Sequence, residues 1–288
     1  MTDLSIIDPL PLHDTLLPKF IYGTAWKEAA TKDLTLKALE NGFTAIDTAN
    51  QRKHYFEQGV GEALQHFYHN SGASRDQLFL QSKFTYQEGQ DERLPYDPSA
   101  SCTTQVEQSF LSSLEHLGTD YLDAYLLHGP SQREGLSERD FEVWEAMESF
   151  YRSGHIKLLG VSNISHDQLE YLQTRASIKP MLVQNRCFAH SGWDTHVRKL
   201  CLRHGIHYQG FSLLTANTAV VNQPDFLSIV QRTGLTAPQV IFQFALKVGM
   251  VVLTGTSDEK HMQEDLQCMK NSLMDEEIII IEQLLMTK

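Results

Sequence analysis

The chain has 288 residues, of which 41% are hydrophobic and 21% charged, as in an ordinary globular protein that can bury a sizeable core. Its formal net charge of −12 argues against nucleic-acid binding, although a local basic pocket for one phosphate stays compatible with it. No apolar run approaches the roughly 20 residues of a membrane span, and the acidic, proline-interrupted N-terminus is unlike a signal peptide.

After an irregular N-terminal start, short apolar runs alternate with helical stretches along the rest of the chain. The runs that predict β-strands are residues 20–26, 43–49, 78–84, 122–129, 156–163, 181–187, 206–214 and 250–256. Between them, apolar residues recur at helical spacing, as in residues 103–118 and 138–154. Several helical stretches end in a glycine before the next strand, namely Gly42, Gly118, Gly154, Gly205 and Gly249.

About eight strand–helix units predict a closed parallel (β/α)8 barrel, the TIM-barrel fold, rather than an open sheet. No linker divides the chain, so we expect one domain over residues 1–288, with residues 275–288 as an additional C-terminal helix packed outside. The longest loop, residues 85–101, follows the third strand. A loop of that length is typical of a functional site, so we expect it to act as a lid.

Polar residues follow the apolar strands, where a (β/α)8 barrel carries its site. The second strand delivers Asp47, the third Lys83 and the fourth His128. Later strands end in Ser162 and Asn163, Gln184 and Asn185, Phe211 and Ser212, and residues 254–256. Taken singly, each is explained as a cap, a surface group or a hydrogen-bonded structural residue. Their joint occurrence on consecutive strands predicts one functional site.

Tyr55 follows Asp47 by eight residues and suggests what the site does. A free phenol has a pKa near about 10. A lysine such as Lys83, held by a carboxylate, is a fixed cation that lowers this pKa when it lies beside the phenol. With His128 orienting the same oxygen, such a phenol can protonate a carbonyl oxygen whose carbon receives a hydride. Hydride chemistry requires a nicotinamide cofactor.

Two other patterns in the sequence do not predict a binding site. His66 with His69, and His204 with His207, have metal-like spacing but no clustered Cys, Asp or Glu partners, so we expect no metal. The glycines of residues 59–64 follow no strand and lack a third glycine, so they do not form a dinucleotide-binding fingerprint.

The segments YGTAW, IDTA, VGEAL, LFLQSKF, YLDAYLLHGP and GVSN, in this order and spacing, resemble the aldo-keto reductases over nearly the whole chain. The resemblance implies a (β/α)8 barrel that uses NADP(H) without metal, and a catalytic tetrad of Asp47, Tyr55, Lys83 and His128. It implies a substrate pocket that includes Trp26 and His128. It also implies cofactor contacts from Gly23, Thr24, Asp47, Ser162, Asn163, Gln184, Phe211, Ser212, Leu213, Gly255, Thr256, Ser257, His261, Glu264 and Asp265.

The tyrosine is displaced relative to the family. The family usually has tyrosine five residues after the aspartate, where this chain has Arg52. The spacing from Asp47 to Val60 is two residues longer than usual, so a small insertion can return Tyr55 to the family position. His54 is the neighbour that competes for this position.

The cofactor contacts also differ from the family. Phe211 stands where a tyrosine often stacks on the nicotinamide, and a phenyl ring keeps the stacking face. Gly255 and His261 stand where the family commonly has the lysine and arginine that bind the 2′-phosphate. Thr256, Ser257 and the following helix start can still bind phosphate, with help from Lys260. We therefore expect NADP(H), with NAD(H) as the alternative.

The leading hypothesis is an NADP(H)-dependent reductase of aldehydes and ketones. A second hypothesis is a catalytically weak, reductase-like protein that binds the cofactor for sensing or scaffolding. A third is an aldolase with Lys83 as a Schiff base, which Asp47 disfavours by keeping the amine charged. The four scattered cysteines, without a C-x-x-C pair, indicate a reducing, cytoplasmic compartment. We expect a small-molecule carbonyl partner, no nucleic acid or membrane, and a monomer, with a dimer left open.

Overall fold

A computed structural model describes residues 8–13, 15–269 and 271–285. Among these residues, eight parallel strands close into a barrel in the order β10-β3-β4-β5-β6-β7-β8-β9. Each run predicted as a strand contains one of them, which confirms the predicted barrel. The barrel strands are β3 (Phe20–Gly23), β4 (Ala45–Asp47), β5 (Phe79–Phe84), β6 (Leu122–Leu127), β7 (Ile156–Ser162), β8 (Leu182–Arg186), β9 (His207–Phe211) and β10 (Val251–Thr254).

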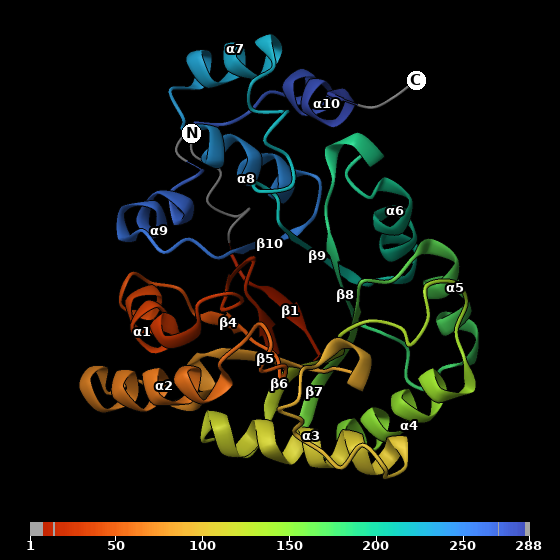
Figure 1. Cartoon of the computed structure of the whole chain (residues 1–288). Helices are drawn as coiled ribbons and strands as arrows, with labels where there is room; N and C mark the ends of the chain where they lie inside the picture. Colours follow the sequence, from red (N-terminus) through yellow and green to blue (C-terminus); the bar gives the residue numbers. More distant parts are fainter. Residues whose placement is uncertain (1–7, 14, 270, 286–288) are drawn as a thin grey trace.

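Helices surround the barrel in a ring, and α10 lies beside α7 and α8 (Figure 1). They are α1 (Thr31–Glu40), α2 (Glu57–Ser71), α3 (Cys102–Leu117), α4 (Glu138–Arg152), α5 (His166–Arg175), α6 (Thr195–His204), α7 (Pro224–Thr233), α8 (Ala237–Lys247), α9 (Glu259–Leu266) and α10 (Asp275–Gln283). The predicted C-terminal helix is therefore confirmed as α10, while residues 286–288 lie outside the described residues. Short 3-10 helices form at η2 (Glu28–Ala30), η3 (Arg75–Gln77), η4 (Gln87–Gly89) and η5 (Ala189–Ser191).

The ends of the helices follow local chemistry. Ser101 caps α3 by accepting a hydrogen bond from the Thr104 N–H. Gly118 ends this helix with a φ of 63°, and its N–H reaches the carbonyls of Glu115 and Leu114. This left-handed conformation favours glycine because a Cβ would be strained there. All five glycines predicted to end helices have positive φ.

The barrel interior is filled by an apolar cluster that includes Ile21, Phe79, Leu126 and Leu158. The N-terminal segment that we expected to be irregular instead forms an antiparallel hairpin of β1 (Leu10–Leu12) and β2 (Thr15–Leu17). Leu17 belongs to this interior cluster, and Leu10 and Leu12 pack against it. Because β3 begins three residues after Leu17, the hairpin closes the N-terminal end of the strands. The opposite, C-terminal end is left for the site.

The loop of residues 85–101 is pinned against the barrel. The Tyr96 hydroxyl donates to the Thr85 carbonyl at 2.7 Å, and the Tyr86 hydroxyl donates to Asp140 Oδ1 at 2.9 Å. Gln90 Nε2 donates to the Asn50 carbonyl at 2.8 Å. Buried aromatic rings and satisfied backbone groups thus hold the loop in one place.

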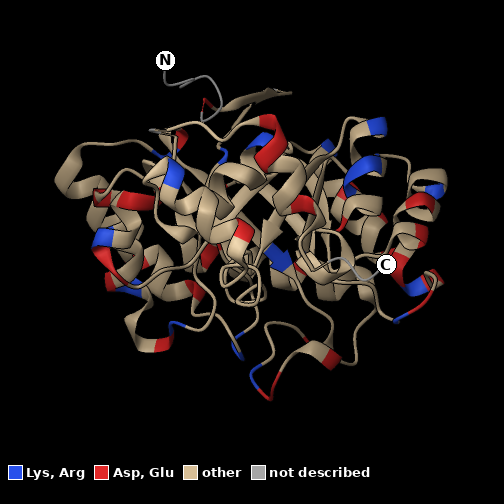
Figure 2. Ribbon diagram, turned by 90° about the horizontal axis from the view of Figure 1, so that it is seen from above, with Lys and Arg blue, Asp and Glu red and all other residues tan. Residues whose placement is uncertain are grey.

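Acidic and basic residues are interspersed over the helices rather than separated onto two faces (Figure 2). The net charge of −12 is therefore spread over the surface. No helix in the described part of the chain is long and apolar enough to cross a membrane.

Candidate active site

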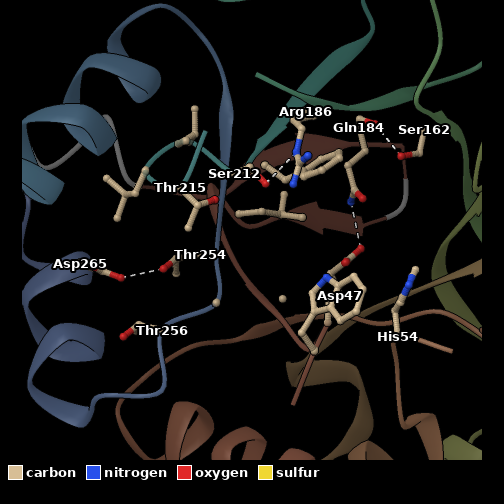
Figure 3. A pocket seen from close by; sticks show the side chains of 18 of the residues that line it. Asp47, His54, Ser162, Gln184, Arg186, Ser212, Thr215, Thr254, Thr256 and Asp265 are labelled. Carbon is tan, nitrogen blue, oxygen red and sulfur yellow. Dashed lines mark hydrogen bonds between the residues drawn. The ribbon is translucent and has the colours of Figure 1, made fainter. Parts of the chain in front are cut away.

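A cavity of about 540 Å³ opens where the barrel strands end. Figure 3 shows Asp47 and His54 toward one side of it and Thr254, Thr256 and Asp265 toward the other. Of the predicted site residues, those that line the cavity are Gly23, Trp26, Asp47, Tyr55, His128, Ser162, Asn163, Gln184, Phe211, Ser212, Leu213, Gly255, Thr256, His261, Glu264 and Asp265. The structure therefore brings most of the predicted set together.

Three predicted residues do not line the cavity. Lys83 lies beneath it, fully buried. Thr24 is also fully buried, and its N–H and hydroxyl both donate to the Asp47 carbonyl, at 3.0 and 2.9 Å. Thr24 thus fixes the end of β4 rather than facing the cavity. Ser257 is exposed outside it. Residues 85–101, all described, contribute no lining residue, so the expectation of a lid over this cavity is wrong for this conformation.

Asp47 and Lys83 form a buried ion pair. Asp47 ends β4, and the parallel register pairs it with Gln81 of β5, two residues before Lys83. Lys83 Nζ donates to Asp47 Oδ1 and Oδ2, both at 2.7 Å, and to the Thr48 carbonyl at 2.8 Å. These bonds use all three ammonium N–H donors. Burial lowers the pKa of Lys83, and the Asp47 charge opposes this. An ammonium held in this way is a poor nucleophile, which counts against the aldolase hypothesis.

Tyr55 lies between Lys83 and His128. Lys83 Nζ is 5.1 Å from the centroid of the Tyr55 ring, and the Tyr55 and His128 ring centroids are 5.9 Å apart. Burial, and secondly the Asp47 charge, raise the pKa of the Tyr55 hydroxyl. The prediction that Lys83 lowers this pKa is therefore wrong in direction, because burial dominates and Lys83 donates its protons elsewhere. The phenol keeps its proton through the neutral range.

The residues of the inserted turn take distinct places. Arg52 stays out of the main cavity and lines a separate cavity of about 290 Å³ with Arg93. His54 lines the main cavity and stacks on Trp26, with ring centroids 3.9 Å apart. The backbone N–H of Trp26 donates to the backbone carbonyl of His54 at 2.7 Å. Tyr55 and His54 thus both reach the cavity, whereas Arg52 does not.

His128 and its neighbours form the adjoining wall. His128 Nδ1 pairs with the Thr85 hydroxyl at 2.7 Å. Burial, followed by the charges of Lys83 and His54, holds the pKa of His128 well below its ordinary value, so the imidazole is neutral at pH 7. Asn163 Nδ2 donates to the His128 carbonyl at 2.8 Å, and the Ser162 hydroxyl donates to the Gln184 carbonyl at 2.7 Å.

The far end of the cavity lies at β10 and α9. The Thr254 hydroxyl donates to Asp265 Oδ2 at 2.8 Å, and burial raises the pKa of Asp265 to about 6. Lys27 Nζ donates to the Gly255 carbonyl at 2.6 Å. Lys260, which we expected to help bind phosphate, does not line the cavity and instead pairs with Glu264 at 3.3 Å.

Sequence reasoning missed two features of the site. Arg186 is the one lysine or arginine among the described cavity-lining residues, and its Nε donates to the Ser212 hydroxyl at 3.2 Å (Figure 3). Its position directly after Asn185, at the end of a predicted strand, could have identified it as a site residue. Gln81 and Gln209 lie fully buried beneath the cavity. An amide side chain inside an otherwise apolar strand was the signal for these two.

The sequence of the chain also resembles known proteins. A family model described as "Aldo/keto reductase family" matches residues 21–286. The chain belongs to this family. It is 32% identical to an uncharacterized oxidoreductase, YtbE, of Bacillus subtilis, over 79% of this chain and 74% of that protein. It is 29% identical to the glyoxal reductase of Bacillus subtilis, over 97% of this chain and 94% of that protein.

Solved structures of this aldo-keto reductase family share its fold. A Bombyx mori aldo-keto reductase in complex with NADP superimposes with a TM-score of 0.78 at 20% identity, covering 96% of this chain and 92% of the other. No group of three or more His, Cys, Asp or Glu among the residues that the structure describes is arranged to hold a metal ion.

Proposed function

We propose that this aldo-keto reductase uses NADP(H) to reduce aldehydes and ketones to alcohols, with Tyr55 as the proton donor. The observation that carries the proposal is the convergence of the Asp47–Lys83 ion pair, Tyr55 and His128 at one end of the cavity. A protonated phenol, a neutral imidazole and a fixed ammonium are the groups needed to protonate an oxygen as its carbon accepts a hydride.

Each member of this cluster has a separate task. The neutral His128 orients the carbonyl oxygen by a hydrogen bond, because an uncharged imidazole can donate without giving up its proton. Tyr55 then transfers its proton to this oxygen and becomes a phenolate. The Lys83 ammonium, 5.1 Å from the ring centroid, stabilises that negative charge. Asp47 keeps Lys83 charged and in place. Solvent returns a proton to Tyr55 before the next turnover.

The cavity fits a nicotinamide dinucleotide, which supplies the hydride when bound. Asn163 Oδ1 and Gln184 Oε1 accept no hydrogen bond from a described residue and would receive the carboxamide N–H groups. Phe211 offers a stacking face. Arg186 has no acidic side chain within ion-pair distance in the described structure and would contact a phosphate. The Bombyx mori relative binds NADP, which supports NADP(H), with NAD(H) as the alternative.

The test is Tyr55→Phe, which removes the acidic proton and keeps the ring. We expect reduction of a simple aromatic aldehyde with NADPH to fall by about a thousandfold, within the range that general acid catalysis contributes. Calorimetric titration of NADP+ should give an affinity close to wild type. Tyr171→Phe, on the outer face of α5, is the matched control and should keep both the reduction rate and the NADP+ affinity of the wild type. An unchanged rate in Tyr55→Phe would show that another group donates the proton.

The alternative is a reductase-like protein that binds the cofactor for sensing or scaffolding. The absence of a lysine at Gly255 is the observation in its favour. Wild-type protein that binds NADP+ but reduces none of a panel of aldehydes and ketones would select this alternative.

A further inference from the structure

We propose that Gln81 and Gln209 are positioning residues, which fix the orientation of the Gln184 amide and hold the Asp47 carboxylate beneath the site. The proposal rests on the proposed function, since it concerns how the same site is held ready. Neither residue lines the cavity, so both act through their neighbours.

The two glutamines form a reciprocal amide pair across the barrel. Gln81 Nε2 donates to Gln209 Oε1, and Gln209 Nε2 donates to Gln81 Oε1, both at 2.9 Å. Both side chains are fully buried. Reversing one amide would place N–H against N–H and oxygen against oxygen, so the two amides can only reverse together. The Asp47 carboxylate accepts from Gln81 Nε2 and therefore selects one of the two joint orientations. Unpaired amides at this depth would be strongly unfavourable.

This orientation dictates that of Gln184. The Gln209 Oε1 that accepts from Gln81 also accepts from Gln184 Nε2, at 2.9 Å. The same Gln184 Nε2 donates to Asp47 Oδ1 at 2.9 Å (Figure 3). Both N–H groups of the Gln184 amide are thus committed below the cavity, and its Oε1 is the atom left for a ligand. A carbonyl oxygen at that place selects a ligand N–H, such as that of a carboxamide.

The pair also acts on Asp47. Gln81 Nε2 donates to Asp47 Oδ1 at 2.6 Å, so this oxygen accepts from Gln81, Gln184 and Lys83 together. Hydrogen bonds from neutral amides stabilise a carboxylate without adding charge. The network therefore holds the Asp47 carboxylate in place, and the carboxylate in turn holds Lys83.

The amide groups of the pair do nothing else. Among the residues that the structure describes, every hydrogen bond of their side chains stays within the set of Gln81, Gln209, Gln184 and Asp47, and none satisfies the backbone. The positions two residues earlier on β5 and β8 belong to an apolar cluster that includes Phe79 and Leu182. Aliphatic side chains at positions 81 and 209 would fill the same space without the cost of burying polar groups. The presence of amides there therefore indicates that they serve the site above them.

The ionisable groups near Asp47 come from several elements. Lys83 lies on β5, and Glu57 of α2 acts on it. Tyr55 and His54 come from the turn before α2, and His128 follows β6. Further along the same cavity lie Arg186, His261, Glu264 and Asp265. The neutral amides of β5, β8 and β9 are the groups that can be changed without altering this set of charges.

The first experiment compares two ligands by calorimetry on Gln209→Met. The ligands are NADP+ and a nicotinamide-free fragment, 2′-phospho-ADP-ribose. We expect the affinity for NADP+ to fall about tenfold, the value of one hydrogen bond, because the Gln184 amide is no longer held. The affinity for the fragment should stay unchanged, since it makes no contact with Gln184.

The control is Gln243→Met, which removes another fully buried glutamine. Gln243 Nε2 donates to the Cys268 and Asn271 carbonyls, away from the cavity. This variant should unfold more easily yet bind both ligands as wild type does. Equal weakening of both ligands in Gln209→Met, or no change in either, would overturn the proposal. If Gln209→Met does not fold, the double variant Gln81→Met/Gln209→Met, which leaves neither amide of the pair without its partner, takes its place.

A second readout is the turnover of Gln81→Met. Loss of one donor to Asp47 should lower kcat about tenfold, since one hydrogen bond to a charged group is worth about that factor and Asp47 then holds Lys83 less firmly. An unchanged kcat contradicts the effect on Asp47. Absence of turnover in the wild type would defeat the proposed function alone, because the ligand comparison does not depend on turnover.

Discussion

Asp265 shows at the scale of one residue how burial makes stability depend on pH. Its folded-state pKa of about 6 lies above the ordinary value of 3.8 because the side chain is buried. A group with a raised pKa contributes stability that is fully present below its unfolded pKa and is lost as the pH rises through its folded pKa. For Asp265 this loss falls between about pH 4 and pH 6.

We predict that Asp265→Asn stabilises the protein at pH 7.5 relative to wild type, by up to about 3 kcal/mol for a shift of this size. An asparagine oxygen can still accept the hydrogen bond from Thr254. Urea unfolding at pH 4.5 and pH 7.5 measures the effect, and the gain should be much smaller at pH 4.5. Asp225→Asn, on the exposed start of α7, is the control for the loss of one carboxylate at the surface. The same gain at both pH values would refute the explanation by burial.

Gly255 tests the choice of cofactor at the same scale. We predict that Gly255→Lys raises the ratio of NADPH to NADH affinity roughly tenfold, by supplying a charge-assisted contact to the 2′-phosphate. A Cβ at this position would lie 3.2 Å from the Gly23 carbonyl and 3.8 Å from Lys27 Nζ, so the backbone must shift slightly. Gly255→Met controls for this crowding without the charge. Equal ratios in the two variants, measured by calorimetry, would refute the prediction.

Single residues of the site could be predicted where the strand pattern fixed their place. Asp47 and His128 directly follow apolar strands, and the spacing around Tyr55 pointed to an insertion. The direction of the Tyr55 pKa shift could not be predicted, because it depends on how deeply the ring is buried and on where the Lys83 protons point. Both depend on packing, which sequence spacing does not report.

At the scale of elements, the N-terminal hairpin should contribute to stability rather than to chemistry. We predict that Leu17→Ala lowers the free energy of unfolding by about 2–5 kcal/mol, the range for a fully buried leucine. Leu16→Ala, at the neighbouring and 57% exposed position of β2, should change it by no more than about 0.5 kcal/mol. Similar losses in both variants, measured by urea unfolding, would show that β2 does not close the barrel as described.

The barrel strands and the outer helices were predictable as elements because each carries its own periodic pattern and end signal. The hairpin was not, since its two strands are three residues each and β1 contains a proline, Pro11. Strands this short have no alternation long enough to recognise. The loop of residues 85–101 was identified from its length, but its anchoring through Tyr86 and Gln90 depends on partners 54 and 40 residues away in the sequence.

At the scale of the whole molecule, closure of the barrel brings together residues from strands that are far apart in the sequence. Counting strand–helix units predicted closure, and closure explains why Asp47 and Gln184 share one cavity. The Gln81–Gln209 pair joins β5 to β9 across the interior, from residues 128 positions apart. Such a contact is invisible to patterns within one strand and follows only from the register of the closed sheet.

The stacking of Trp26 on His54 gives the protein a built-in optical probe. Of the three tryptophans, Trp144 and Trp193 are packed in the core, whereas 70% of the Trp26 surface is open to water at the rim of the cavity. The long-wavelength part of the intrinsic emission therefore comes mainly from one indole. Molecules that bind against this rim will change the emission wavelength and intensity of Trp26, so occupancy can be followed in real time without a label.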